Sequence, residues 1–465
     1  MEPTTDPGAN RGHDSDGIVA ELTAVLREAA EAQGAPGAVT GVLVGDRSHV
    51  ASYGVTSVEH PQALDARSLF QVGSISKTFT SAAVMVLVQE GKVALDDPVS
   101  RHLPDLAAAT GLDLDSITVE HTLSHQSGFD GDHLFVDRET HDLAALADAR
   151  RMFAPGTGFS YSNAGFSIAG AVIEAASRQT FESFVRTRLL LPLGMTSASF
   201  RADDAITHQV AMPHWLADGE AFVLRRLGWQ PGWELGPVDR AAAGLIASVD
   251  HLLAWCRFQR TGLGLDGGVV LTPESLDRLH TPVVNANLLE DIGLDWFVEQ
   301  PGGCTAIGHG GVTAGYVSDL VIVPDHELGI VTLTNATNGG AVNQVVRRWA
   351  LDRFAGIVER DPEPDPSLVV DPACFAGRYV HSFAELVVTS GPTSGTVVVT
   401  PERRQDDTAW QPPLDPPVTY AFFSADHAVS VDESGPARVI RFGFEPGSDR
   451  ASWVLSGSRR APRQA

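Results

Sequence analysis

The sequence predicts an α+β fold in which an antiparallel sheet, flanked by helices, carries a helical subdomain and is followed by a small all-β barrel. Strand-like segments lie near both ends of residues 18–360, and the segments between them are mostly helical. Because these strands enclose the helices, we expect the first and last of them to pair in one sheet. From 371 to 465 the pattern changes to short strands separated by Gly, Pro and Asp, which predicts a second domain.

The larger domain follows a flexible polar arm at 1–17 and begins with an amphipathic helix at 18–33. Two strand-like runs around Gly45-Asp46-Arg47 predict a β-hairpin. An apolar segment of helical spacing then begins at Ser74 and predicts a buried helix that packs on the sheet. The predicted elements of this domain also include strands at 38–44, 48–54, 315–323 and 328–335, and helices at 142–151, 167–178, 181–191 and 342–354.

The smaller domain is preceded by residues 361–370, whose proline-rich, charged composition predicts a semi-stiff linker. Its strand-like runs are short and regularly interrupted, as expected for a small barrel or sandwich. They lie at 377–380, 386–389, 396–400, 419–423, 428–431, 437–444 and 452–455.

Composition excludes several classes of partner and cofactor. The formal net charge of −25 argues against nucleic acid and anionic membranes, because phosphate groups attract basic patches. No stretch of about 18 apolar residues could span a bilayer, and the first residues lack the basic and apolar regions of a secretory signal. Three scattered cysteines do not make a disulfide framework. We therefore expect a cytoplasmic protein and, since no cluster has metal-ligand spacing, no metal or other cofactor.

Ser74 precedes Lys77 by three residues, and Lys77 is one of only two lysines in the chain. Arginine stays protonated, whereas a buried lysine can lose its proton and accept one from a serine hydroxyl. On a helix the two side chains share a face, and the helix N-terminus favours a developing alkoxide. The pair predicts a nucleophilic serine, although a capping serine followed by a surface lysine has the same spacing.

Tyr161 and Asn163 follow a loop rich in Pro and Gly at 153–158 and precede a helical segment at 164–176. Such a loop would present the tyrosine hydroxyl to a cleft, where it could carry a second proton. A partly buried structural tyrosine is the alternative.

His309 lies in the segment Gly308-His309-Gly310-Gly311-Val312, just before a predicted strand. Consecutive glycines allow a backbone to approach a ligand closely, so this segment is a candidate wall of the cleft. His309 could donate to a substrate carbonyl or carboxylate, or exchange protons with Tyr161, unless it is a turn histidine without a chemical role. We interpret residues 122–128, which include His125, as a structural loop under the site.

Together these segments resemble the serine β-lactamase and penicillin-binding-protein superfamily, in its class C β-lactamase-like branch of esterases, D-aminopeptidases and peptide cyclases. The resemblance covers about residues 18–358 and implies a β-lactamase/transpeptidase-like fold. Its marks, specific in this order, are Ser74-x-x-Lys77, 123–128, Tyr161-Ser162-Asn163, 243–248 and His309-Gly310-Gly311.

The resemblance implies a role for each of these residues. Ser74 would be the acylated nucleophile, and Lys77 and Tyr161 would transfer its protons. Asn163 would hold the acyl chain of the substrate or Lys77.

The same resemblance implies that the backbone amides of Ser74 and Val312 form the oxyanion hole, with Gly310 and Gly311 beside them. His309 stands where many relatives carry the lysine of a K-T-G triad. Since histidine is mostly neutral near pH 7, it would attract the carboxylate of a penicillin weakly, and we do not expect efficient β-lactam hydrolysis.

The β domain resembles the lipocalin-like domain of several hydrolases and of penicillin-binding-protein-type thioesterases, which release and cyclise nonribosomal peptides. This resemblance implies an acyl-Ser74 intermediate formed from a peptidyl (thio)ester, for which a carrier protein is a candidate donor. A cytosolic esterase or D-amino-acid peptidase with the same intermediate is one alternative, and a non-catalytic penicillin-binding-like sensor is another. We expect the β domain to roof the cleft and to offer Arg438 or Arg441 to a substrate carboxylate.

Overall fold

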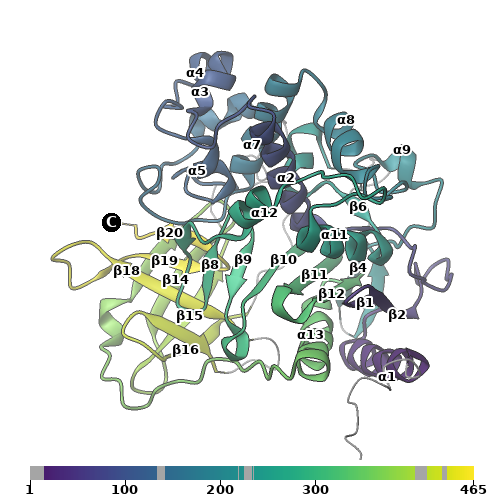
Figure 1. Cartoon of the computed structure of the whole chain (residues 1–465). Helices are drawn as coiled ribbons and strands as arrows, with labels where there is room; N and C mark the ends of the chain where they lie inside the picture. Colours follow the sequence, from purple (N-terminus) through teal and green to yellow (C-terminus); the bar gives the residue numbers. More distant parts are fainter. Residues whose placement is uncertain are drawn as a thin grey trace, which may run out of the picture.

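The computed structural model describes residues 15–132, 142–217, 219–224, 233, 235–403, 416–431 and 437–464. These residues form a larger α+β domain and a C-terminal β barrel that packs beside its sheet (Figure 1). Helices of the larger domain gather above the sheet in this view, and the barrel lies at the lower left. This is the arrangement that the sequence predicts.

An antiparallel sheet in the order β2-β1-β12-β11-β10-β9-β8-β7 is the centre of the larger domain. Its first and last long strands pair, with Ala38 opposite Thr334, as expected from the sequence. The strands are β1 Gly37–Val44, β2 Arg47–Gly54, β7 Val284–Asn285, β8 Glu290–Ile292, β9 Phe297–Glu299, β10 Ala306–Thr313, β11 Tyr316–Val323 and β12 Leu328–Thr334. Two small ribbons accompany them, β3 Phe70–Gln71 with β6 Ile246–Ala247 and β4 His214–Ala217 with β5 Glu220–Val223.

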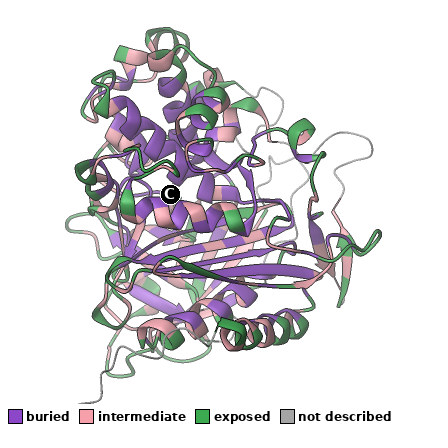
Figure 2. Ribbon diagram, turned by 45° about the vertical axis from the view of Figure 1, so that its right-hand side comes forward, coloured by how far each residue is buried: buried purple, intermediate pink, exposed green. Residues whose placement is uncertain are grey.

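Helices cover both faces of this sheet. On one face α1 and α13 bury Leu22, Leu26 and Val346 against the strands, and their outer sides are exposed (Figure 2). On the other face lies α2, which is buried along most of its length. The helices are α1 Ser15–Gln33, α2 Ser76–Gln89, α3 Val99–His102, α4 Pro104–Thr110, α5 Val119–Leu123, α7 Asn163–Ser177, α8 Phe181–Val185, α9 Ala202–Ala205, α10 Arg240–Ala243, α11 Val249–Thr261, α12 Pro273–His280 and α13 Gly339–Ala355.

The core around α2 explains why this segment is apolar on all sides. The Phe79 ring stacks on Trp255 of α11 with ring centroids 3.7 Å apart. Small residues, Ala82 and Ala83, are fully buried in the same cluster, where a larger side chain would push the neighbouring helices away. A rigid, fully packed helix therefore carries the residues that follow Ser74.

Three local predictions differ from the structure. Ser74 does not begin the α-helix, because it lies in a 3-10 turn, Gly73–Ile75, directly before α2. The helix predicted at 142–151 is the short 3-10 segment Leu143–Asp148, in which only Leu146 is buried. The helix predicted at 181–191 is α8 followed by a π-helical turn, Arg186–Leu190.

The C-terminal domain is a nearly closed antiparallel barrel in the order β13 to β20, as the lipocalin-like resemblance implies. A bridge between Tyr379 and Arg463 joins its first and last strands, and Tyr379 and Phe442 lie in its core. Seven strands match the predicted runs, and the eighth, β20, was not predicted. The strands are β13 Gly377–Val380, β14 Glu385–Ser390, β15 Thr396–Glu402, β16 Val418–Phe422, β17 His427–Ser430, β18 Val439–Phe444, β19 Ala451–Ser456 and β20 Arg459–Pro462.

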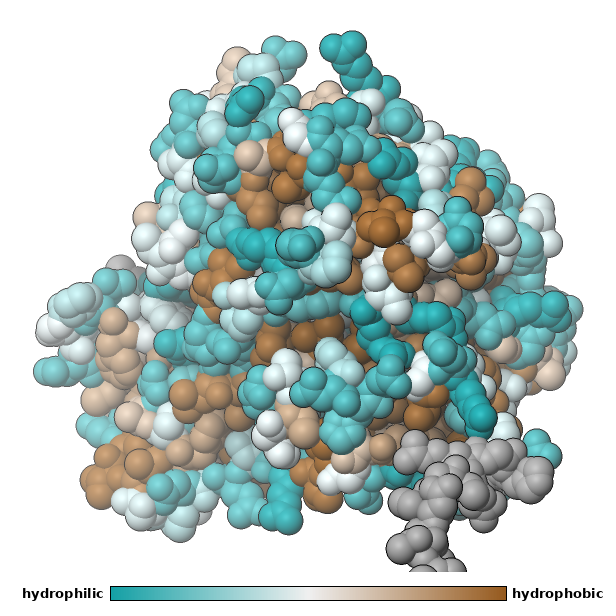
Figure 3. Space-filling view, viewed as in Figure 1, coloured by the Kyte–Doolittle hydropathy of each residue, from teal (hydrophilic) through white to brown (hydrophobic). Residues whose placement is uncertain are grey.

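The regions outside these two domains are short. Most of the predicted arm lies outside the described residues, and residues 15–17 belong to α1. The predicted linker contains no helix or strand. Polar side chains cover much of the face in Figure 3, with apolar groups in separate patches between them. Within the described ranges, every helix is too short or too polar to cross a bilayer.

Candidate active site

Ser74 is held close to strand β10 by the glycine that precedes it. Gly73 has φ +55°, and a Cβ atom at this position would lie 2.7 Å from the backbone nitrogen of Val312. The Ser318 hydroxyl donates to the Val72 carbonyl at 2.8 Å and fixes the turn to the sheet. The pairing of β10 with β9 ends at Gly308, so the following residues of β10 face the turn that carries Ser74.

Lys77 is fully buried one turn after Ser74. Its Nζ lies 3.0 Å from the Ser74 Oγ and donates to the Ala242 carbonyl at 2.7 Å. Burial lowers the pKa of Lys77 to about 7, although the negative charge of Asp295 acts in the opposite direction. At neutral pH about half of the amines are therefore unprotonated and can accept the Ser74 proton.

Tyr161 packs its ring against this amine, with Nζ 4.8 Å from the ring centroid. Within the described part of the chain its hydroxyl makes no well-aligned hydrogen bond, but the Ser74 side chain lies close enough to lower the pKa of Tyr161. Burial raises the pKa of Tyr161 well above its ordinary value, and Asp295 raises it further. A neutral Tyr161 hydroxyl can donate a proton, whereas the Lys77 amine can accept one.

His309 and His125 both lie next to the Tyr161 ring, with ring centroids 6.0 and 4.3 Å from it. Both histidines contact the buried carboxylate of Asp295, whose Oδ1 lies 3.2 Å from Nε2 of His125 and 3.3 Å from Nε2 of His309. The His309 contact has ion-pair distance but poor hydrogen-bond alignment. His125 is thus in direct contact with the site, and not only in a loop beneath it.

Asn163, the first residue of α7, points toward the barrel. Its Nδ2 donates to Asp132 Oδ1 at 2.6 Å, so this donor is engaged with Asp132 rather than with Lys77. The same carboxylate forms an ion pair with Arg459 of β20. Arg459 also lies over the Tyr161 ring, with its Cζ 5.1 Å from the ring centroid.

The structure places the two arginines proposed from the sequence elsewhere on the barrel. Arg438 is exposed, and its backbone amide donates to the Ser430 hydroxyl. Arg441 donates to the Ala286 carbonyl at 3.3 Å. The arginine next to the catalytic candidates is therefore Arg459.

Gly310, Gly311 and Val312 form the part of β10 beside the serine turn. A Cβ atom on Gly311 would lie 2.0 Å from the Val72 carbonyl, so only glycine permits this approach. The Val312 side chain is exposed.

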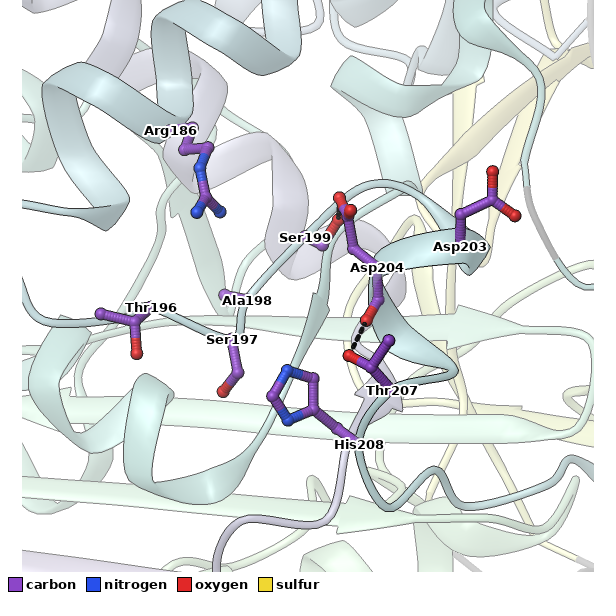
Figure 4. Close-up of a pocket in the computed structure, with 9 residues that line it drawn as sticks. All are labelled: Arg186, Thr196, Ser197, Ala198, Ser199, Asp203, Asp204, Thr207 and His208. Atoms are coloured by element: carbon purple, nitrogen blue, oxygen red, sulfur yellow. Dashed lines mark hydrogen bonds between the residues drawn. The ribbon is translucent and has the colours of Figure 1, made fainter.

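One pocket of the structure is lined by none of the predicted site residues. Its volume is about 370 Å³, and Arg186, Asp204 and His208 are among the side chains that line it (Figure 4). Within the described ranges, no group of three or more His, Cys, Asp or Glu side chains could hold a metal ion.

Sequence reasoning missed three charged residues of the site, Asp132, Asp295 and Arg459. Asp295 had a detectable signal, because a carboxylate between Leu294 and Trp296 interrupts an apolar run. Asp132 and Arg459 had no comparable signal, since each becomes meaningful only when the barrel meets the larger domain.

A serine hydroxyl 3.0 Å from a buried amine whose pKa is lowered to about 7 is an arrangement in which the serine can be acylated, and it lies on a β-lactamase/transpeptidase-like fold. The Beta-lactamase family model matches residues 22–353, and the chain belongs to this family. Proteins of this fold are serine hydrolases or acyltransferases. Similar proteins include penicillin-binding protein 4 of Amycolatopsis lactamdurans, 30% identical over 74% of this chain and 93% of that protein. Penicillin-binding protein 4* of Bacillus subtilis is 25% identical over 75% and 79%.

Solved structures extend the likeness to the barrel. The crystal structure of SurE covers 97% of this chain and 100% of its own, with a TM-score of 0.75 and 25% identity. A class C β-lactamase covers 74% of this chain and 98% of its own, with a TM-score of 0.63 and 20% identity, and shares the fold of the larger domain.

Proposed function

We propose that this protein takes a peptidyl group from a thioester or ester onto Ser74 and transfers it to the peptide's own amine, releasing a macrocyclic peptide. The substrate class is a nonribosomal peptide, for which a carrier protein in the cytoplasm is the proposed donor. The parent chemistry, acyl transfer through a serine ester, belongs to the family. The cyclic product is the specific part of the proposal.

The observation that carries the proposal is the position of the barrel over the catalytic candidates. The Tyr161 amide donates to the Ser458 carbonyl of the barrel at 2.8 Å, and the Arg460 amide donates to the Ser160 hydroxyl at 3.1 Å. An apolar cluster of Phe159, Tyr161 and Leu455 joins the two domains at the same place. A barrel in this position supports a lipocalin-domain thioesterase, since it would form part of the wall of the substrate-binding site beside Tyr161.

The likeness of SurE over both domains supports the same reading. A further structure of SurE contains D-Leu, with a TM-score of 0.73 and 23% identity to this chain. The proposed donor carries a D-configured residue at its acyl end.

Acylation follows from the contacts of Ser74. The neutral Lys77 amine takes the proton of Ser74 Oγ as this oxygen attacks the acyl carbonyl. The amides of Ser74 and Val312 would stabilise the resulting oxyanion. As the bond to the leaving group breaks, the leaving sulfur or oxygen receives a proton from Tyr161, which Lys77 then restores. The product is a Ser74 ester and a free thiol or alcohol.

Deacylation reverses these proton transfers with a different nucleophile. The peptide amine attacks the ester, its proton passes to the neutral base, and Ser74 leaves with a proton. Lys77 and Tyr161 are both buried, which limits the access of water to the ester. A dry site of this kind favours the amine over water.

The test is incubation of the protein with a peptidyl thioester mimic that ends in a D-residue and has a free N-terminal amine. The proposal predicts a cyclic product, which mass spectrometry identifies by a mass 18 units below that of the linear acid. The N-acetylated peptide thioester is the matched control, because its acyl group can be transferred to Ser74 but its blocked amine cannot close the ring. A purely linear acid from the free-amine peptide would reject cyclisation and leave the esterase or D-peptidase alternative.

The sensor alternative requires that the protein binds its ligand without catalytic turnover at Ser74. A fluorophosphonate probe should add to the wild-type protein and not to Ser74→Ala, as measured by intact mass. A wild-type protein without an adduct would favour the sensor.

A further inference from the structure

Asp295 lies in the short turn between β8 and β9, and its side chain is fully buried. Its backbone has φ +77°, a left-handed conformation that costs energy for any residue with a Cβ atom. A buried carboxylate in a strained backbone is expensive unless the surroundings hold it there. Its contacts therefore indicate what it does.

The first contact fixes the protonation of His125. The Ser162 amide donates to Nδ1 of His125 at 2.9 Å, so Nδ1 must be the unprotonated nitrogen. The proton of this imidazole is then on Nε2, which donates to Asp295 Oδ1 at 3.2 Å. His125 is consequently neutral and cannot balance the charge of the carboxylate.

The second contact concerns His309. Its Nδ1 faces the Gly310 carbonyl, which can only accept, and its Nε2 faces the Asp295 carboxylate, which also only accepts. The Nε2 atoms of His309 and His125 are thus both directed at the same carboxylate oxygen, so one buried side chain contacts both rings.

We propose that Asp295 is a positioning residue of the acyl-transfer site, which fixes His125 and His309 next to Tyr161. The inference rests on the proposed acylation of Ser74 but is independent of the acceptor.

A structural role and a positioning role can be separated by pH. The charged or titratable groups that act on Lys77 are Asp295, Arg459, Asp132 and Asp239. Those that act most strongly on Asp295 are His309 of β10 and His125, and the charge of Asp295 in turn acts on Lys77 and Tyr161. The negative charge of Asp295 raises the pKa of Lys77, so removing it lowers this pKa. The acid limb of the acylation rate should then move to lower pH, which a simple loss of packing would not cause.

The experiment measures the rate of fluorophosphonate labelling of Ser74 between pH 5 and pH 9 in wild type and Asp295→Asn. Asparagine keeps the shape of aspartate and tolerates left-handed φ. We expect the plateau rate to fall by about 10²-fold, because the two rings lose their common anchor, and the acid limb to shift downward. If Asp295→Asn had the same plateau rate as wild type and the same pH dependence on the acid side, the inference would be overturned.

Two variants keep the test decisive. Asp295→Gly suits φ +77° and should fold even if Asp295→Asn does not. Asp97→Asn is the matched control, because Asp97 is also buried and contacts His102 Nε2 at 2.9 Å, away from the site. The Asp97→Asn variant should keep the plateau labelling rate and the acid-side pH dependence of wild type. Labelling of wild type without cyclisation of the peptidyl thioester would contradict the proposed function and leave this inference standing.

Discussion

The pKa of Lys77 predicts how the acylation rate depends on pH. Burial moves this pKa from 10.5 to about 7. At about 1.4 kcal/mol per pKa unit, the interior disfavours the ammonium form by about 5 kcal/mol. Half of the amines are then neutral at pH 7, which is about 10³-fold more than for a lysine in water.

Only the neutral amine can accept the Ser74 proton, so the rate should follow its population. We expect the labelling rate with a fluorophosphonate to rise about tenfold per pH unit below pH 6 and to level off above pH 8. Stopped samples analysed by intact mass give the rate at each pH. A rate that is flat from pH 5 to pH 9, or that continues to rise toward pH 10, would refute the assignment of Lys77 as the base.

Substitution of the two lysines completes this test. Lys77→Arg keeps a positive charge but cannot accept a proton, so labelling should fall by at least about 10³-fold. Lys92→Arg is the matched control, because Lys92 is the other lysine of the sequence and pairs with Glu90 at the surface. Its rate should equal that of wild type.

Three further substitutions test the geometry of the site. Tyr161→Phe should slow acyl transfer to the peptide amine by about 10²-fold in single-turnover kinetics, with an unchanged melting temperature, because the ring stays and only the O–H is lost; a full rate would remove Tyr161 from proton transfer. Arg459→Gln leaves the buried Asp132 without its cationic partner and should lower the free energy of unfolding in urea by about 3 kcal/mol, and Asp132→Asn in the same protein should recover most of this loss. Without that recovery the two residues do not act as a pair. Gly73→Ala introduces a Cβ atom 2.7 Å from the Val312 nitrogen at φ +55°, so labelling should slow by at least about tenfold, together with a loss of about 1–2 kcal/mol of stability; an unchanged labelling rate would mean that the close approach of β10 is not needed.

Much of the fold was predictable because it depends on local patterns. The hairpin at the start of the sheet and the helix after Ser74 follow from apolar periodicity and turn residues. The pairing of β1 with β12 follows from a different observation, that strands enclose the helical segments. Seven barrel strands follow from the same rules. The eighth strand, β20, has the sequence Arg459-Arg460-Ala461-Pro462, which lacks the β-branched and aromatic residues that indicate a strand. Its pairing with β19 is decided by the closure of the barrel.

The site divides in the same way. Ser74 and Lys77 are three residues apart, so a local helical geometry predicts their contact. Asp132 and Arg459 come from different domains, and only the packing of the barrel on the larger domain brings them together, whereas Asp295 reaches the site through the turn between β8 and β9. Because β20 lacks a strand signal, Arg459 had none either, and the arginines named from the sequence, Arg438 and Arg441, lie just before and within β18, two strands from β20.

The electrostatics of Lys77 give the barrel a direct part in the chemistry. Asp295 and Asp132 both raise the pKa of this amine and favour its protonated, inactive form, whereas Arg459 lowers it. Asp132 is paired with Arg459, so the barrel neutralises one of the carboxylates that act on the base. Asp295 has His125 and His309 as its partners. Burial has the largest influence on the pKa of Lys77, and the positive charge of Arg459 lowers this pKa further, so the barrel favours the neutral amine next to Ser74.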